Sequence, residues 1–362
     1  MVVMALDHTR DYFYYSAFDP TDVNHSSTVL FFTRWVTHYC APVFVFLSGT
    51  SAFLSQGRGK TKKEAAFQLL TRGIWLIIME LTVVKLGWTF NFNYNLVFVQ
   101  VIWAIGWSMI LLSALIFLPR PAILAIGLLI IFGHDALDGI SASSLGSNSN
   151  WWRVLHEQGP IKYGNGNTLM IFYPLIPWVG VMPVGYCFGA IFRLPEQQRN
   201  KWLYGIGFSA IALFIILRAI NIYGDPAPWH TLPIWRRTLL SFINCTKYPP
   251  SLLYLLMTIG PAITVLPLLE RMSGAVAGRF FTVYGRVPFF YYILHIYLIH
   301  VLAVLVELKQ KGSKTVTIFI HPSLSLFKVY VIYIVVVLLL YFPCRWFMHV
   351  KMNNKKWWMS YL

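Results

Sequence analysis

Five polar residues, Asp7-His8-Thr9-Arg10-Asp11, follow directly on an apolar N-terminal stretch. On an α-helix, His8 and Asp11 share a face at a spacing of three residues, and Asp7 and Asp11 share one at a spacing of four. A carboxylate beside an imidazole fixes the tautomer of the ring and raises its basicity, which suits a general base. The pattern therefore predicts His8 as a base supported by Asp11 or Asp7. The alternative is that these residues lie at a membrane interface, where water solvates their charge.

A second polar pair lies inside the apolar segment 29–55, where Arg34 and His38 are one helical turn apart. A charged side chain in the middle of a membrane costs about 2.5–3.5 kcal/mol even on the lower scales. We therefore expect both side chains to face a polar interior that they share with the first helix. Pro42 and the small residues Ser48-Gly49-Thr50-Ser51 let this segment bend and let neighbouring helices approach closely.

The composition of the chain indicates the fold class that positions these polar residues. Hydrophobic residues make up 57% of the 362 residues and charged residues 12%, whereas a soluble domain carries about 25% charge. Stretches long enough to cross the hydrocarbon layer of a membrane recur along the whole chain. We predict an all-α, polytopic transmembrane helix bundle of about ten helices, forming a single domain over residues 1–362. The apolar segments are approximately 1–17, 29–55, 73–92, 97–118, 121–137, 169–192, 202–223, 251–269, 287–308 and 326–348.

The first of these segments is short on its N-terminal side, so we expect that the first helix is truncated there or that the start codon is misassigned. The net charge of +16 is spread over alternate loops instead of forming a basic arm, which argues against a nucleic-acid partner. Four cysteines occur without a CxxC pair, so we expect no metal site.

Lys and Arg are concentrated in the loops that begin at residues 56, 119, 193 and 270 and in the C-terminal tail. Both termini are therefore predicted to be cytoplasmic.

Several stretches resemble a known family. They are Ala5 to Phe13, Phe31 to Trp35, Cys40 to Gly49, Tyr173 to Gly180, Lys247 to Leu253 and Gly285 to His295. The chain resembles bacterial relatives of the heparan-alpha-glucosaminide N-acetyltransferase catalytic domain, within the transmembrane acyltransferase group. The resemblance implies transfer of an acyl group, usually acetyl, from cytosolic acyl-CoA to a hydroxyl or amine of an extracytoplasmic glycan. It also implies a multi-pass protein of the cell (inner) membrane.

The resemblance also bears on individual residues. His8 matches a histidine that the group carries in its first helix after an arginine, and that arginine would fall before Met1. His25 is the nearest equivalent of a proposed catalytic histidine in the loop before the second helix. With His8 as the base, Arg34 or His38 is expected to stabilise the oxyanion or to hold the acceptor. The expected substrate-binding residues are Arg34, His38, His25, Lys247, Tyr248 and His295.

The expected partners are membrane lipids, acyl-CoA as the donor substrate and a glycan acceptor, with a homodimer left open. Three basic residues, Arg271, Arg279 and Arg286, either meet the phosphates of CoA or are ordinary cytoplasmic charge.

Two other functions use the same polar residues. A transporter would bind a substrate or relay protons through them. A haem-binding electron carrier would use His38 and His295 as axial ligands, although His295, in an aromatic run, also fits a hydrogen-bonded core position.

The orientation gives the first testable prediction. Single cysteines at Ser147 and Thr231, in loops 138–168 and 224–250, should react with an impermeant thiol reagent added outside intact cells. Ser273→Cys, in the loop expected to be cytoplasmic, is the matched control and should react only after the membrane is opened. Protection of both outer positions in intact cells would reverse the predicted orientation.

Overall fold

The structure is a computed structural model that describes residues 1–56, 59, 61–164, 166–311, 322–354, 356, 359 and 361. Parts of the predicted basic loop 56–72 and of the C-terminal tail lie outside these residues. The chain forms two compact units. Unit 1 contains residues 1–40, 82–92 and 268–362, and unit 2 contains residues 41–81 and 93–267. Each unit is described by itself below, and the single domain over 1–362 stays a prediction.

The prediction of an all-α polytopic bundle is confirmed. Each of the ten apolar segments contains an α-helix. In the described part of the chain, seven helical stretches are long and apolar enough to cross a membrane, when helices that follow each other almost directly are counted together. They are Thr28–Gln56, Arg120–Leu137, Leu175–Arg193, Glu196–Ile220, Leu252–Met272, Pro288–Gln310 and Leu326–Asn353. The count of about ten spans and the cytoplasmic position of both termini stay predictions.

Unit 1 is built around its N-terminal helix. Helix α1 (Val2–Phe13) packs against α2 (Thr28–Thr37), α14 (Pro288–Lys311) and α15 (Leu326–Asn353). Helices α5 (Lys85–Thr89) and α13 (Val276–Arg286) complete the unit. Apolar side chains of α1, α13, α14 and α15 form one buried core, so the polar face of α1 is held in a fixed position beside them.

The second apolar segment forms two helices where one was expected. Ser27 caps α2 by accepting a hydrogen bond from the N–H of Leu30 at 3.2 Å. Helix α2 ends at Thr37, and α3 (Cys40–Gln56) begins after His38 and Tyr39. Pro42 accounts for the break, because its ring carries no N–H to bond the carbonyl of His38 and clashes with it. The break leaves His38 as the C-cap of α2.

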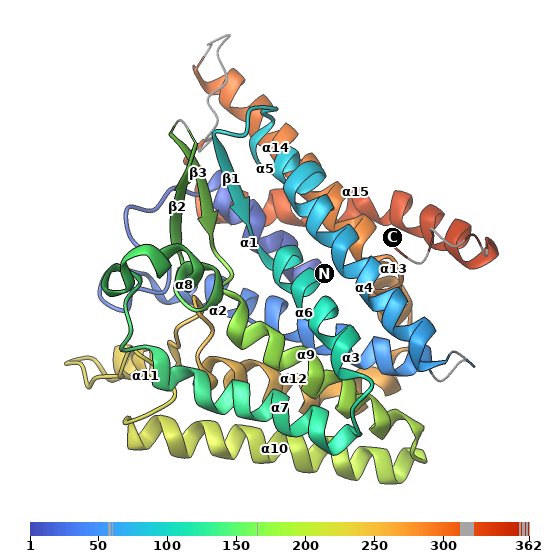
Figure 1. Cartoon of the computed structure of the whole chain (residues 1–362). Coiled ribbons are helices and arrows are strands. Elements are labelled where there is room, and N and C mark those ends of the chain that lie inside the picture. The colour runs from blue at the N-terminus through green and yellow to red at the C-terminus, as the bar shows by residue number, and fades with distance from the viewer. Residues whose placement is uncertain are drawn as a thin grey trace. The chain divides into compact units, whose positions relative to one another are not determined.

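Unit 2 holds most of the remaining helices, and in Figure 1 several of them run alongside one another. Helix α4 (Lys62–Met79) packs on α6 (Val101–Leu115), and α9 (Leu175–Phe188) packs on α6 and on α7 (Arg120–Gly133). The short turns η2 (His134–Leu137), η3 (Ala142–Asn148) and η4 (Gly189–Arg193) extend or connect helices, while η1 (Glu80–Val84) has only its first two residues in unit 2. The others are α8 (Ser149–Leu155), α10 (Glu196–Ile220), α11 (Trp235–Ile243) and α12 (Leu252–Met272), of which unit 2 includes the part to Pro267.

A small sheet replaces helix at the start of two predicted segments. Strand β1 (Leu96–Val99) pairs in parallel with β3 (Asn167–Ile171), which pairs antiparallel with β2 (Gly159–Tyr163), and the order β1-β3-β2 is visible in Figure 1. Segments 97–118 and 169–192 were expected to be helical throughout, and for these few residues that expectation is wrong. Buried and partly buried side chains alternate along β1, the period of a strand, and a hydropathy window cannot separate so short a run from a helix.

Glycines bring two helices of unit 2 into close contact. A Cβ at Gly49 on α3 would lie 2.1 Å from the carbonyl oxygen of Met182, and one at Gly185 would lie 2.0 Å from that of Phe46. Thr50 Oγ1 donates a hydrogen bond to the Gly185 carbonyl at 2.9 Å. The small-residue run 48–51 therefore allows the close helix contact expected of it.

Gly49→Ala should destabilise the fold, because the added methyl group meets backbone that cannot rotate away. We expect a loss of about 1–3 kcal/mol, the usual cost of overpacking, seen as a lower thermal unfolding midpoint in detergent. Gly205→Ala on α10 is the control, since no atom lies within 4 Å of a Cβ there. Equal midpoints for the two variants would contradict the close contact.

Candidate active site

An ion pair in unit 1 joins the first two helices. Both carboxylate oxygens of Asp7 accept hydrogen bonds from Arg34 Nη1, each at 2.7 Å. Thr37 Oγ1 donates to Asp7 Oδ1 at 2.9 Å. Because Asp7 lies on α1 and the other two residues on α2, this carboxylate connects the two helices.

Arg10 adds a second guanidinium to the same carboxylate. Its Nη2 lies 2.8 Å from Asp7 Oδ1 and 2.5 Å from Asp11 Oδ1. The Arg10 side chain is 4% exposed and that of Asp11 is 43% exposed, so the pair runs from the core to solvent. We call Asp7, Arg10, Asp11, Arg34 and Thr37 the Asp7 cluster. Two carboxylates and two guanidiniums balance its charge, which lets it be largely buried.

The Asp7 cluster borders a cavity of about 280 Å³ in unit 1. Guanidinium and carboxylate groups line one part of it, and aromatic rings from the loop after α1 line another. The lining residues are Arg10, Asp11, Tyr14, Tyr15, Ser16, Phe18, Asp19, Pro20 and Arg34. The cavity therefore offers charged groups and flat apolar rings to the same small ligand, a mixture typical of binding sites.

His8 lies against aromatic rings of the same unit. Its ring centroid is 4.8 Å from that of Trp88, 5.1 Å from that of His295 and 6.4 Å from that of Tyr292. His8 is one helical turn before Asp11 on α1, but it is not one of the residues that line the cavity. The structure pairs Asp7 and Asp11 with arginines, whose fixed charge and planar fork suit a carboxylate. The support of His8 by either carboxylate stays a prediction.

His295 is a fully buried residue of α14. Its Nδ1 lies 2.9 Å from the carbonyl oxygen of Tyr291, and its ring stacks on the ring of the same tyrosine at 5.1 Å. These contacts fit the alternative stated for His295 in the sequence analysis, a hydrogen-bonded position in the core. The contact between His295 and His8 also keeps it beside the predicted base.

The other two candidate histidines of unit 1 have contrasting surroundings. His38 is 3% exposed and caps α2. His25 lies in the loop between α1 and α2, with 67% of its side chain exposed and its Nδ1 2.6 Å from Asp22 Oδ2. The hydrogen bond with His25 lowers the pKa of the Asp22 carboxyl. Neither histidine is among the residues that line the cavity.

Lys247 and Tyr248 belong to unit 2. Lys247 is largely buried, with Nζ 5.1 Å from the centre of the Tyr248 ring, and Tyr248 packs edge-on against Tyr173 at 5.4 Å. The structure thus brings these two predicted residues together with each other. Their role in binding a substrate stays a prediction.

Sequence reasoning missed several members of the site. Arg10 is part of the polar run 7–11, but the sequence pattern predicted that Asp7 and Asp11 support His8, with no role for Arg10. Tyr12 was also overlooked: its hydroxyl donates to the Trp88 carbonyl at 3.0 Å and lies 3.2 Å from His300 Nδ1. The sequence did contain a signal for Arg10, because it lies between acidic residues at helical spacing. Nothing in the sequence links Tyr12 to His300, because the two are far apart in the chain.

Together, the fold and this site define a multi-pass membrane protein with a charged site inside a helical unit. The family model described as heparan-alpha-glucosaminide N-acetyltransferase, catalytic, matches residues 1–223. The chain therefore belongs to this membrane acetyltransferase family, as the resemblance predicted. The matched range contains the whole Asp7 cluster and His8. A comparison with curated proteins finds no match.

Removing the negative charge of Asp7 should lower the stability of the protein. Asp7→Asn leaves the guanidiniums of Arg10 and Arg34 close together with less compensation, so it should destabilise the protein by about 3 kcal/mol, the lower range for breaking a buried pair. Asp22→Asn is the control, because its pair with His25 is exposed and worth about 1 kcal/mol or less. Thermal unfolding of the purified proteins measures both. A midpoint for Asp7→Asn no lower than for Asp22→Asn would contradict the role of the cluster.

Proposed function

We propose that this chain moves an acyl group, acetyl in the simplest case, from cytosolic acyl-CoA to a hydroxyl or amine of an extracytoplasmic glycan. The observation that carries the proposal is that α1 presents His8 one turn from Asp11, within a family-matched segment whose charged residues border a cavity. The family supports acetyl transfer in a membrane. The donor, the acceptor and the inner membrane of the cell as location are part of the proposal.

The acceptor is proposed to occupy the cavity beside the Asp7 cluster. At about 280 Å³ the cavity is at the small end of ligand pockets, which suits one terminal sugar unit better than an acyl-CoA. The rings of Tyr14, Tyr15 and Phe18 offer apolar faces to a sugar ring, and Asp11 and Asp19 offer acceptors for its hydroxyl groups. In the predicted orientation, the loop that carries these rings is outside the membrane.

His8 is proposed to act as the general base. A ring nitrogen takes the proton of the acceptor hydroxyl or amine while that oxygen or nitrogen attacks the thioester carbonyl carbon. The carbonyl oxygen then carries negative charge, which the guanidinium of Arg34 or Arg10 stabilises. When the carbon–sulfur bond breaks, the CoA thiolate leaves and the proton on His8 returns to it. The products are the acylated glycan and free CoA.

The aromatic surroundings of His8 support this role. Trp88, Tyr292 and His295 hold the imidazole of the half-buried His8 among rings and limit its contact with water, and a base with fewer competing waters transfers protons to a bound partner. The balanced Asp7 cluster keeps two guanidiniums fixed near the same turn of α1. Fixed charges cost no reorganisation when the oxyanion forms.

His8→Ala should lower the rate of acyl transfer by about two to four orders of magnitude, the range for loss of a general base. The binding of acyl-CoA should change much less, because the base contacts the acceptor. The measurements are free CoA release and acceptor acylation, at matched amounts of folded protein. His349→Ala, an exposed histidine on α15 of the same unit, is the control and should keep full turnover.

The outcome also separates the alternatives. Near-normal turnover of His8→Ala, with loss in His25→Ala or His38→Ala, would move the base to the loop or to the end of α2. No thioester cleavage by the wild-type protein, with uptake of a solute instead, would replace the acyltransferase by a transporter. A haem spectrum in the purified protein would favour the electron carrier.

A further inference from the structure

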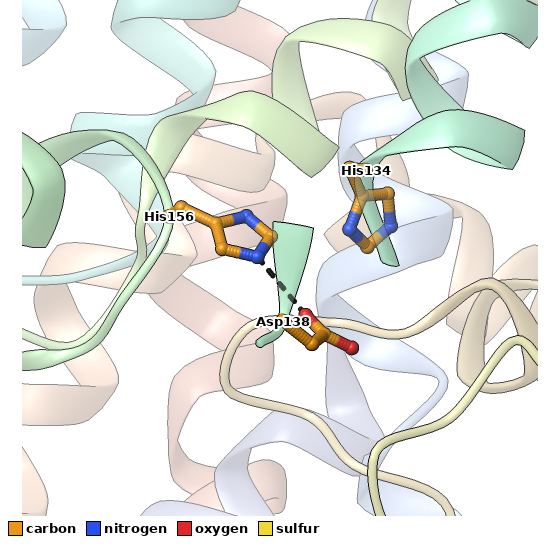
Figure 2. Close-up of side chains that lie close together, drawn as sticks. All are labelled: His134, Asp138 and His156. Atoms are coloured by element: carbon orange, nitrogen blue, oxygen red, sulfur yellow. Dashed lines mark hydrogen bonds and ion pairs between the residues drawn. The ribbon is translucent and has the colours of Figure 1, made fainter. Parts of the chain in front are cut away.

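Two histidines and an aspartate meet in unit 2. His134 begins the 3-10 turn η2 that follows α7, Asp138 is the C-cap of that turn, and His156 is the C-cap of α8. Figure 2 shows the three side chains pointing toward one another. One possible ligand atom from each lies within 4.8 Å of the other two. His156 Nε2 is already 2.9 Å from Asp138 Oδ1.

The two imidazoles are buried with nitrogens that lack hydrogen bonds. The His134 side chain has 0% exposure, and that of His156 has 3%. Within the described residues, neither ring nitrogen of His134 makes a hydrogen bond, and neither does Nδ1 of His156. A buried polar atom without a partner costs about 1–3 kcal/mol. Such atoms are rare in folded proteins, and a bound ion is one physical explanation for them.

We propose that His134, Asp138 and His156 bind one divalent first-row transition metal ion, with Zn²⁺ as the ion to test. Two neutral imidazoles and one carboxylate form a mixed nitrogen and oxygen donor set, which suits zinc or iron better than the all-oxygen sites of Mg²⁺ and Ca²⁺. Three protein ligands leave a fourth position for water. Because Asp138 keeps 19% exposure, an ion and a water molecule can reach the site from solvent.

The spacing of the donors fits such an ion after small side-chain rotations. Tetrahedral zinc with bonds of about 2.0–2.1 Å holds its ligand atoms roughly 3.3 Å apart. His156 and Asp138 are slightly closer than this, and the remaining separations, at most 4.8 Å, have to shrink by about 1.5 Å at most. His134 and Asp138 lie at the two ends of the same short turn, which keeps their donor atoms within this range.

A second carboxylate is placed to orient His134. Asp135 Oδ1 lies 3.1 Å from His134 Nδ1, and Asp135 Oδ2 accepts the N–H of Leu252 at 3.0 Å. The two atoms make no hydrogen bond in the structure, but a small rotation of the ring when an ion binds Nε2 would let this carboxylate hold a proton on Nδ1. Metal-binding histidines commonly have such a carboxylate behind them, and it raises their affinity. Asp135 is therefore a positioning residue of the proposed site.

The segment between the ligands is already held together by hydrogen bonds. Trp152 Nε1 donates to the Ile140 carbonyl at 2.8 Å, and Glu157 Oε2 accepts the N–H of Ala142 at 2.6 Å. These bonds bring the end of α8 back to the end of α7 before any ion binds. The ligand positions are thus largely formed in advance, which reduces the ordering needed for binding.

The test uses the full chain, purified in detergent on an affinity tag without histidines, stripped with a chelator and re-equilibrated with Zn²⁺. Elemental analysis should find about one zinc per wild-type chain. His134→Gln and His156→Ala should each retain less than a tenth of it, and Asp135→Asn should weaken zinc binding by about 10- to 100-fold. His230→Ala, an exposed histidine of the same unit, should bind like the wild type. Co²⁺ in place of zinc should give the visible absorption of a nitrogen- and oxygen-bound ion.

The folding of the variants is checked separately. Chelated wild type and His134→Gln should unfold at similar temperatures, since the substitution removes no hydrogen bond, whereas Zn²⁺ should raise the midpoint of the wild type only. Wild-type protein that holds no more zinc than the His134→Gln, His156→Ala double variant would overturn the proposal. Equal loss of zinc in His230→Ala would overturn it as well. Both readouts are independent of acyl transfer.

Discussion

The carboxylate of Asp7 is the contact on which the candidate site depends. It receives Arg34 and Thr37 from α2 and Arg10 from its own helix, so one side chain sets both the spacing of the helices and the position of two guanidiniums. An isolated carboxylate could not be kept at such a low exposure. The cluster solves this by balancing charge within two turns of α1 and one of α2. His8, on the same turn of α1, is held among rings that come from elsewhere in unit 1.

The same principle of local compensation separates the two polar sites of the protein. In the Asp7 cluster every charge has an opposite charge within 3 Å. In the His134 site three ring nitrogens of the two histidines make no hydrogen bond among the described residues, and both rings are at most 3% exposed. A cluster whose charges balance is a scaffold even though Arg10 Nη1 makes no hydrogen bond among the described residues, while uncharged rings buried with unpaired nitrogens point to something that binds. This contrast is why we assign the first to positioning groups around a reaction and the second to a metal ion.

The helical architecture could be predicted from the sequence because apolar length is set by the thickness of a membrane, and each predicted segment contains a helix. Burial cost also indicated that Arg34 and His38 face a polar interior shared with the first helix, and Arg34 does contact that helix, at Asp7. Spacing could not rank the partners of Asp7, because His8, Arg10 and Asp11 all lie within one turn of each other. The contact of Gly49 with the helix that carries Gly185, and of His134 with His156, depends on tertiary packing over many residues. A single sequence without known contacts does not contain that information.

The division of the chain has a consequence for the order in which the protein can be completed during synthesis. Unit 1 takes residues 1–40, a short piece at 82–92 and everything from 268 onward, so its first two helices emerge long before α14 and α15. His8 acquires Trp88 as a neighbour early, but Tyr292 and His295 only when nearly the whole chain has been made. Until then the apolar side of α1 has no packed partner from the end of the chain. The ionic contacts between α1 and α2 need only the first forty residues, and they can hold this hairpin together until the last helices arrive.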